Sequence, residues 1–309
     1  MAWILRGLRD GIVTTRYPRR SDGYQNGFRG AISVVEDSLG ILSEGQGFRH
    51  DINQEPSISS LCPSGAIIAN EDRISVDRGK CILCGRCVEA RPDIFCFESS
   101  TEVASVSRKS LVVPSCIDDD ESLPSLRSEL AKKVRILRRS VHVRHVDAGS
   151  DGSEESEIWA LTNPVYDVQR LGIFFTVTPR HADLLLVTGV GTAGMIEPLR
   201  NTYEAMPHPK IVIAVGTDAI SGGLVHPNYA TGGGIGDILH VDVWVPGSPP
   251  SPFSILHGIL LGIGLLAGDN EAGNNKAGDN EAGNNKVRHN RAGSDSTRDA
   301  KFGATRRDD

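Results

Sequence analysis

Three closely spaced cysteines are the residues in this sequence best suited to chemistry. Cys81, Cys84 and Cys87 stand in the stretch CILCGRC, which has the pattern C-x2-C-x2-C. A tight loop of this kind wraps one side of a cube, so it supplies three of the four thiolates that hold a [4Fe–4S] cluster. The usual bacterial run ends with a further cysteine before a proline, but Arg91 precedes Pro92 here. A complete cluster therefore needs a fourth ligand from elsewhere in the chain.

A suitable fourth thiolate lies upstream, in the stretch SSLCPSGAI. Cys62 precedes Pro63 there, and in proteins with two such motifs the cysteine before the proline ligates the cluster of the other motif. The same spacing counted back from Cys62 would place the ligands of a second cluster where the sequence has Ile52, Glu55 and Ile58. The pattern therefore predicts one complete [4Fe–4S] cluster and one lost cluster. The arginine before Pro92 replaces a ligand of the lost one.

A zinc site and a set of inert thiols are the alternatives for these cysteines. Zinc can be held by four cysteines, but a C-x2-C-x2-C triplet with a remote Cys-Pro is more typical of iron–sulfur sites. Cys96 and Cys116 have no partner at a metal-binding spacing, so we expect them to be incidental thiols. Four of the six cysteines of the chain fall between Cys62 and Cys87, which favours metal binding over a disulfide framework.

Composition narrows the class of protein. The chain has 309 residues, 39% apolar residues and a formal net charge of −6, so we expect a globular protein that does not bind nucleic acid. No secretory signal is apparent at the N-terminus, and the longest apolar run, ILLGIGLLA, is too short for a span that needs about 20 residues. We expect a cytoplasmic protein. The first residues form a weak amphipathic pattern, suited to a membrane surface, to a membrane-bound partner or to their own domain.

Periodicity divides the chain into four predicted segments. Residues 1–115 contain five of the six cysteines and a hairpin in AIIANEDRISVD, residues 116–140 form a charged linker helix, and residues 141–266 form an α/β domain. In the α/β domain, HADLLLVTG, KIVIAVGTD and VDVWVPGSPP read as buried parallel strands, AGMIEPLRNTYEAMP as a crossover helix and SPFSILHGILLGIGLLA as a closing helix. Residues 267–309 carry a tandem AGDNEAGNNK repeat and are predicted to be disordered.

Both halves of the chain resemble subunits of energy-converting [NiFe]-hydrogenases and respiratory complex I. Residues 1–110 resemble the ferredoxin-like subunit, through TTRYPRR, GFRGAI, LCPSGAI and CILCGRCVEA. Residues 140–266 resemble the small subunit of the same complexes, through DAGS, LTNPVYDVQRLGI, TPRHADLLLVTG, PLRNTYEAMPHPKIVIAVGT and VPGSPPSP. The resemblance implies a fusion of an α+β ferredoxin-like domain with an α/β flavodoxin-like domain that has a parallel sheet.

The resemblance also implies where the small subunit would hold its own cluster. In that family a [4Fe–4S] cluster next to the active site is bound by cysteines, but this chain has no cysteine after Cys116. The matching positions are Asp151, Glu154, Asp218 and Ser248, and hard oxygen ligands do not hold such a cluster. These side chains could bind Mg²⁺ or Ca²⁺, form a hydrogen-bonded polar cluster that carries protons, or be solvated polar residues.

Two functions follow from the resemblance. The first is an electron-transfer subunit with one [4Fe–4S] cluster, peripheral on the inner face of the membrane. Its partners would be a hydrogenase-like or complex I-like large subunit and the membrane subunits of the same complex. The second is a non-redox coupling subunit, in which the remaining cluster is structural. Neither would be catalytic alone.

Overall fold

The structure is a computed structural model that describes residues 2–20, 22–35, 58–70, 73–114, 122–134 and 140–266. Met1–Asp269 forms one compact unit. The predicted disordered tail at 267–309 and Cys116 lie outside the described residues.

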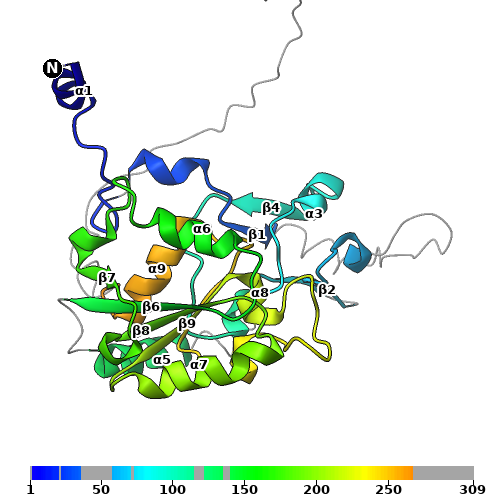
Figure 1. Ribbon diagram of the computed structural model, residues 1–309. Coiled ribbons are helices and arrows are strands. Elements are labelled where there is room, and N and C mark those ends of the chain that lie inside the picture. The colour runs from blue at the N-terminus through cyan, green and yellow to red at the C-terminus, as the bar shows by residue number, and fades with distance from the viewer. Residues whose placement is uncertain are drawn as a thin grey trace, which may run out of the picture. The chain divides into compact units, whose positions relative to one another are not determined.

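A five-stranded parallel sheet forms the centre of the C-terminal part (Figure 1). Its strands follow one another in space in the order β10-β9-β8-β6-β7. The order matches that of flavodoxin-like α/β folds, in which the strand order reverses between the first and third strands of the domain, here β6 and β8. The strands are β6 (Val141–Asp147), β7 (Ile173–Phe175), β8 (Leu184–Thr188), β9 (Ile211–Val215) and β10 (Val243–Val245).

Helices cover both faces of this sheet. On one face, Ile158 of α6 (Ser153–Ala160) and Leu256 of α9 (Pro252–Gly262) share an apolar core with the strands. On the other, Leu199 of α7 (Ala193–Ala205) packs with Ile220 of α8 (Gly216–Ser221). Figure 1 shows α9 and α7 on opposite sides of the strands. The residues of β8 and β9 are fully buried, as expected for parallel strands covered on both faces.

The predicted α/β elements are confirmed in type and order. The three apolar runs form β8, β9 and β10, and the predicted crossover and closing helices are α7 and α9. In the segment predicted as a linker helix, α5 (Ser122–Lys133) buries Leu130 against the same core as α9.

Two small antiparallel sheets form the cysteine-containing part. In one, β1 (Ala31–Val34) pairs with β4 (Phe95–Glu98). In the other, the predicted hairpin is confirmed, because β2 (Ile67–Ala69) pairs with β3 (Ile74–Asp77), which also pairs with β5 (Val112–Val113). The ferredoxin-like fold predicted for this part stays a prediction. Among the described residues of the N-terminal half, the helices are α1 (Ala2–Asp10), α3 (Arg86–Ala90) and three short 3-10 helices, at Gly23–Gly27, Ile58–Leu61 and Lys109–Leu111. Three further 3-10 helices lie in the C-terminal part, at Val168–Leu171, Pro179–His181 and Ile235–Asp237.

Backbone hydrogen bonds join the two parts of the unit. Ser105 and Trp244 of β10 exchange both of their backbone hydrogen bonds, at 2.9 and 2.8 Å. The neighbouring amide of Ala104 donates to Nδ1 of His257 in α9 at 3.3 Å. The segment after β4 is therefore fixed against both the edge strand and the closing helix. The predicted boundaries between the segments stay a prediction.

Candidate functional site

All four cysteines of the predicted cluster set line one cavity. Cys62, Cys81, Cys84 and Cys87 surround about 20 Å³ of space, with apolar side chains that include Ile32, Ile67 and Val76. Cys62 directly follows the 3-10 helix Ile58–Leu61, Cys81 and Cys84 lie in the turn between β3 and α3, and Cys87 is in the first turn of α3. The fold thus brings the remote Cys-Pro element to the same cavity as the triplet. That these cysteines bind a cluster stays a prediction.

The backbone around the cysteines is shaped to present sulfur atoms to this cavity. Leu83 has φ 55° and Gly85 has φ 78°, so the chain between Cys81 and Cys87 turns through left-handed conformations that only glycine adopts easily. The amide of Ala66 donates to Sγ of Cys62 at 3.2 Å. Such hydrogen bonds to sulfur are one way in which proteins adjust the potential of a cluster.

The chemistry of the donor set fits a cluster. The four thiols form no disulfide, and burial raises the pKa of Cys81 to about 12, so the metal-free thiol is protonated and inert. Within the described residues, no three His, Cys, Asp or Glu side chains converge on a point where one metal ion could bind. A cubane cluster differs from one ion because it spreads its four thiolates around a cube. An apolar cavity lined by four thiols suits that arrangement.

Thr217, in the first turn of α8, connects the cysteine loop to the parallel sheet. Its hydroxyl lies 3.0 Å from the carbonyl oxygen of Cys81 and 3.1 Å from that of Gly247. Its amide also donates to the carbonyl oxygen of Gly247, at 2.7 Å. Gly79, two residues before Cys81, packs against the same helix, because a Cβ added at Gly79 would lie 2.8 Å from the side chain of Ile220. The cysteine loop therefore lies directly against α8.

Glu154 lies in the first turn of α6 and is completely buried. Its carboxyl group packs against Gly216, where an added Cβ would lie 2.5 Å from Oε1, and Gly216 has φ 92°. Glycine is therefore required at this position both for space and for conformation. Oε2 accepts from the hydroxyl of Ser153 at 3.0 Å, whereas Oε1 has no hydrogen-bond partner among the described residues. Burial raises the pKa of Glu154 to about 7, and the charges of Asp218 and Asp151 add to the rise.

Two of the other predicted positions, Asp218 and Asp151, lie near Glu154. Asp218 is half-buried in α8, and burial raises its pKa, with the charges of Asp151 and Glu155 adding to the effect. Asp151 is exposed in the loop before α6, and hydrogen bonds from Ser153 lower its pKa. Ser248 lies in the turn after β10, next to the carbonyl group that Thr217 contacts. The structure thus places the predicted positions in neighbouring loops at the carboxyl ends of the strands, where α/β folds bind ligands.

Comparison with known proteins identifies the C-terminal part. Residues 152–261 match the family described as NADH ubiquinone oxidoreductase, 20 Kd subunit. The probable membrane-bound hydrogenase subunit mbhJ of Pyrococcus furiosus is 41% identical over 142 residues, which cover 46% of this chain and 85% of that protein. The chain belongs to this family.

Two further relatives of this 20 Kd subunit family member share its C-terminal part. Subunit 7 of formate hydrogenlyase of Escherichia coli (strain K12) is 40% identical over 154 residues, 50% of this chain. The aligned region spans 59% of the length of subunit 7. A subunit of the NADH-quinone oxidoreductase of Geotalea daltonii is 43% identical over 104 residues, which cover 34% of this chain and 61% of that protein. These relatives are subunits of membrane-bound hydrogenase and complex I-type complexes. The family match begins after the cysteine motifs, so the ferredoxin-like fusion stays a prediction.

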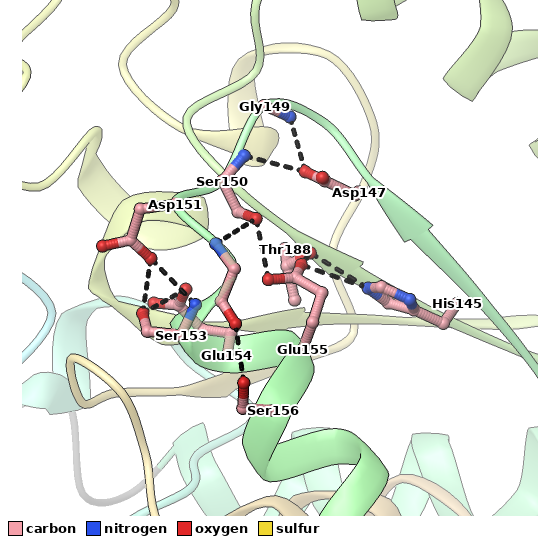
Figure 2. A network of polar contacts seen from close by, with 11 residues as sticks. His145, Asp147, Gly149, Ser150, Asp151, Ser153, Glu154, Glu155, Ser156 and Thr188 are labelled. Carbon is pink, nitrogen blue, oxygen red and sulfur yellow. Dashed lines mark hydrogen bonds and ion pairs between the residues drawn. The ribbon is translucent and has the colours of Figure 1, made fainter.

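A second polar network in this family member was not predicted from the sequence. Figure 2 shows Glu155 of α6 between Ser150 and Thr188, with His145 of β6 beyond. Ser150 donates to Oε2 of Glu155 at 2.7 Å, and Thr188 donates to Oε1. Nε2 of His145 lies 3.0 Å from the hydroxyl of Thr188, and burial lowers the pKa of this histidine. The network lies between β6 and β8, where the strand order reverses. Thr188 ends an apolar strand, and this was the one sequence signal that pointed to the network.

Proposed function

We propose that this chain is an iron–sulfur electron-transfer subunit of a membrane-associated oxidoreductase related to hydrogenases and complex I. It would hold one [4Fe–4S] cluster through Cys62, Cys81, Cys84 and Cys87. The observation that carries the proposal is that these four cysteines line one largely apolar cavity. The chain would act as part of a complex and would not be catalytic alone.

Bound there, the cluster would supply one-electron transfer. The chain's own residues would fix its position and its exposure. Cys81 is buried and its loop is held by Thr217, whereas Cys84 is exposed. Electrons would therefore enter or leave on the side of Cys84. The amide of Ala66 would stabilise the thiolate of Cys62.

Two exposed apolar regions of the surface could bind partner subunits of the kind found in hydrogenase-like complexes. One lies beside the acidic positions and includes Leu224, Val225 and Tyr229 in the loop after α8, which are 53%, 52% and 101% exposed. It suits a large subunit. The other is α1, where Leu5 and Leu8 are 68% and 77% exposed. It suits a membrane subunit or the inner membrane surface. No helix among the described segments could itself span a membrane.

A non-redox coupling subunit is the second candidate, and a specific observation favours it. The positions that carry cluster cysteines in the resembling small subunits are carboxylates and a serine here, and one of them, Glu154, is fully buried. Oxygen ligands of this kind do not hold a [4Fe–4S] cluster, so the electron path past Thr217 would end. The cysteine-bound cluster would then stabilise the fold.

Iron and acid-labile sulfide content of anaerobically purified protein tests the proposal. One cluster gives about four irons and about four sulfides per chain. About eight irons would contradict the loss of the second site, and one tightly bound zinc without sulfide would contradict the cluster itself. Reduction by the complex's own electron donor, followed by electron paramagnetic resonance, separates the two candidates. An electron-transfer subunit is reduced and reoxidised during turnover, whereas a structural cluster is not.

A further inference from the structure

The carboxyl group of Glu154 is buried without the partners that a carboxylate needs. The side chain is 0% exposed, and only one of its two oxygens accepts a hydrogen bond from another side chain. None of the ion pairs in the described part of the chain involves Glu154. Burying a charged carboxylate without a cation costs several kcal/mol. The neutral acid avoids most of this cost.

The surrounding ionisable groups also favour the neutral form. Asp218 in α8 and Asp151 in the loop before α6 lie near enough for their charges to raise the pKa of Glu154. Both are acidic, and Asp151 is kept ionised by its hydrogen bonds from Ser153. Figure 2 shows Asp151 and Glu154 on either side of that serine. A second negative charge at Glu154 would therefore be repelled from two directions.

The three carboxyl groups form a gradient of exposure that leads from the interior to solvent. Glu154 is buried, Asp218 is half-buried and Asp151 is exposed. Burial also raises the pKa of Asp218, so the two less exposed acids of the group both favour the protonated form.

We propose that Glu154 is a proton-binding site, at which the chain holds one proton near neutral pH and exchanges it with solvent. The proton leaves a carboxyl oxygen of Glu154 as its O–H bond breaks, and water accepts it. No electron moves in this step. The site goes beyond electron transfer, because it depends only on α6, α8 and the loop at 151 and does not require a cluster at the cysteines.

A divalent cation is the main competing ligand for the same side chains. A cation would need at least three converging ligands, and no such group occurs among the described residues. Full burial of Glu154 behind Gly216 also leaves no open path for a hydrated ion at Oε1. A proton needs neither space nor several ligands, so it fits the unpartnered oxygen better.

Thermal unfolding of the full chain between pH 5 and pH 8 tests the site. The pKa of Glu154 is about 7 in the folded chain, against an ordinary value of 4.5. The folded chain therefore binds the extra proton, and its stability falls as pH rises from about 4.5 to about 7. Glu154→Gln mimics the neutral acid and escapes this loss. We expect the difference in Tm between E154Q and the wild type to grow as pH rises, in favour of the variant. A difference that does not change with pH overturns the proposal.

Matched controls keep this test specific. Glu197→Gln makes the same substitution at an exposed glutamate of α7, and we expect its Tm difference to stay flat across the pH range. Asp218→Asn removes one repelling charge, so the fall in Tm caused by deprotonation of Glu154 should occur at lower pH than in the wild type.

Infrared spectroscopy supplies a readout that does not depend on unfolding. The carbonyl band of a protonated acid should be present in the wild type at pH 6, weaker at pH 8.5 and absent from E154Q.

Added Mg²⁺ or Ca²⁺ distinguishes a proton site from a cation site. We expect millimolar amounts of either metal to leave the Tm of the wild type unchanged at pH 8. A rise in Tm that is lost in E154Q would overturn the proposal in favour of a cation site. Because these measurements do not use the cysteines, they can fail while the proposed electron transfer holds, and the reverse is also possible.

Discussion

The hydroxyl of Thr217 lies 3.0 Å from the backbone carbonyl oxygen of Cys81 and so joins the cysteine loop to the acidic edge of the parallel sheet. Both groups are buried, and the residues are far apart in the sequence. The predicted cluster would therefore lie beside the place where the resembling small subunits bind their own cluster. With the packing of Gly79 beside Ile220, this hydrogen bond joins the cysteine loop and α8 into one structural unit.

Removing the Thr217 hydroxyl should weaken that unit. Thr217→Val keeps the shape of the side chain but leaves the carbonyl oxygen of Cys81 without its donor. Because a buried acceptor without a partner costs about 1–3 kcal/mol, we expect a loss of that size in the free energy of unfolding. Denaturant unfolding measures it. Thr217→Ser retains the hydroxyl and should lose less than half as much, and equal losses in the two variants would show that the hydrogen bond is not the cause.

The turn that leads into Cys81 depends on an ion pair between Asp77 and Arg108. Both oxygens of Asp77 accept from the guanidinium at 2.8 Å, and Oδ1 also accepts from the amide of Gly79 at 2.9 Å. Asp77 is buried, so Arg108→Gln should cost about 1.5–3 kcal/mol and lower the iron content of the purified protein. Arg86→Gln makes the same change in α3 and should have little effect on stability. Similar losses in both would contradict the assigned role of Arg108.

Acid should loosen the contact between α9 and the segment after β4. Burial lowers the pKa of His257 to about 4 from its ordinary 6.5, and the charge of Arg127 adds to the fall. In the folded chain Nδ1 of His257 accepts from the amide of Ala104 at 3.3 Å. The unfolded chain binds a proton on this ring below pH 6.5 and the folded chain does not, so stability falls as pH drops from 6.5 to 4. His257→Asn keeps an acceptor without a titrating ring. The difference in Tm between H257N and the wild type should shift in favour of the variant as pH falls, and a constant difference would refute this cause.

The exposed apolar face of α1 should determine attachment to the membrane or to a membrane subunit. Leu5 and Leu8 are exposed in the free chain, and each buried leucine contributes about 1.5–3 kcal/mol. Replacing both with Gln should reduce the membrane-bound fraction at least tenfold in a sedimentation assay and leave the Tm unchanged. An unchanged membrane fraction would show that attachment lies elsewhere. The matched control is Leu126→Gln in α5, a partly exposed leucine outside this helix.

Sequence patterns predicted the strands whose residues are apolar because they are buried. They missed a strand that carries polar residues because it helps to build a polar site. The strands β8 and β9 are continuous apolar runs, and both were predicted. The interior strand β6 was not, because VHVRHVD alternates apolar residues with histidine and arginine. One of those polar residues, His145, faces Thr188 and Glu155. A strand that helps to build a polar site therefore lacked the usual signal of a buried parallel strand.

The resemblance to the small-subunit motifs predicted the positions Glu154 and Asp218. It could not predict the burial or the protonation of their side chains. Nothing in the local sequence shows that Glu154 is buried, because its burial depends on the approach of Gly216 from a segment distant in the chain. The bond from Thr217 to Cys81 likewise joins loops that have no sequence relationship. Motif spacing identified which residues matter, and tertiary packing determined how they act.

The ligand set of the cluster is the central claim, and two alanine variants test it most directly. After anaerobic purification and reduction, electron paramagnetic resonance should show a [4Fe–4S] signal in the wild type and in Cys96→Ala, because Cys96 is exposed on β4 and outside the cavity. The signal should be lost, or reduced to a minor [3Fe–4S] species in the oxidised sample, in Cys62→Ala. A full [4Fe–4S] signal in Cys62→Ala, or its loss in Cys96→Ala, would contradict the account.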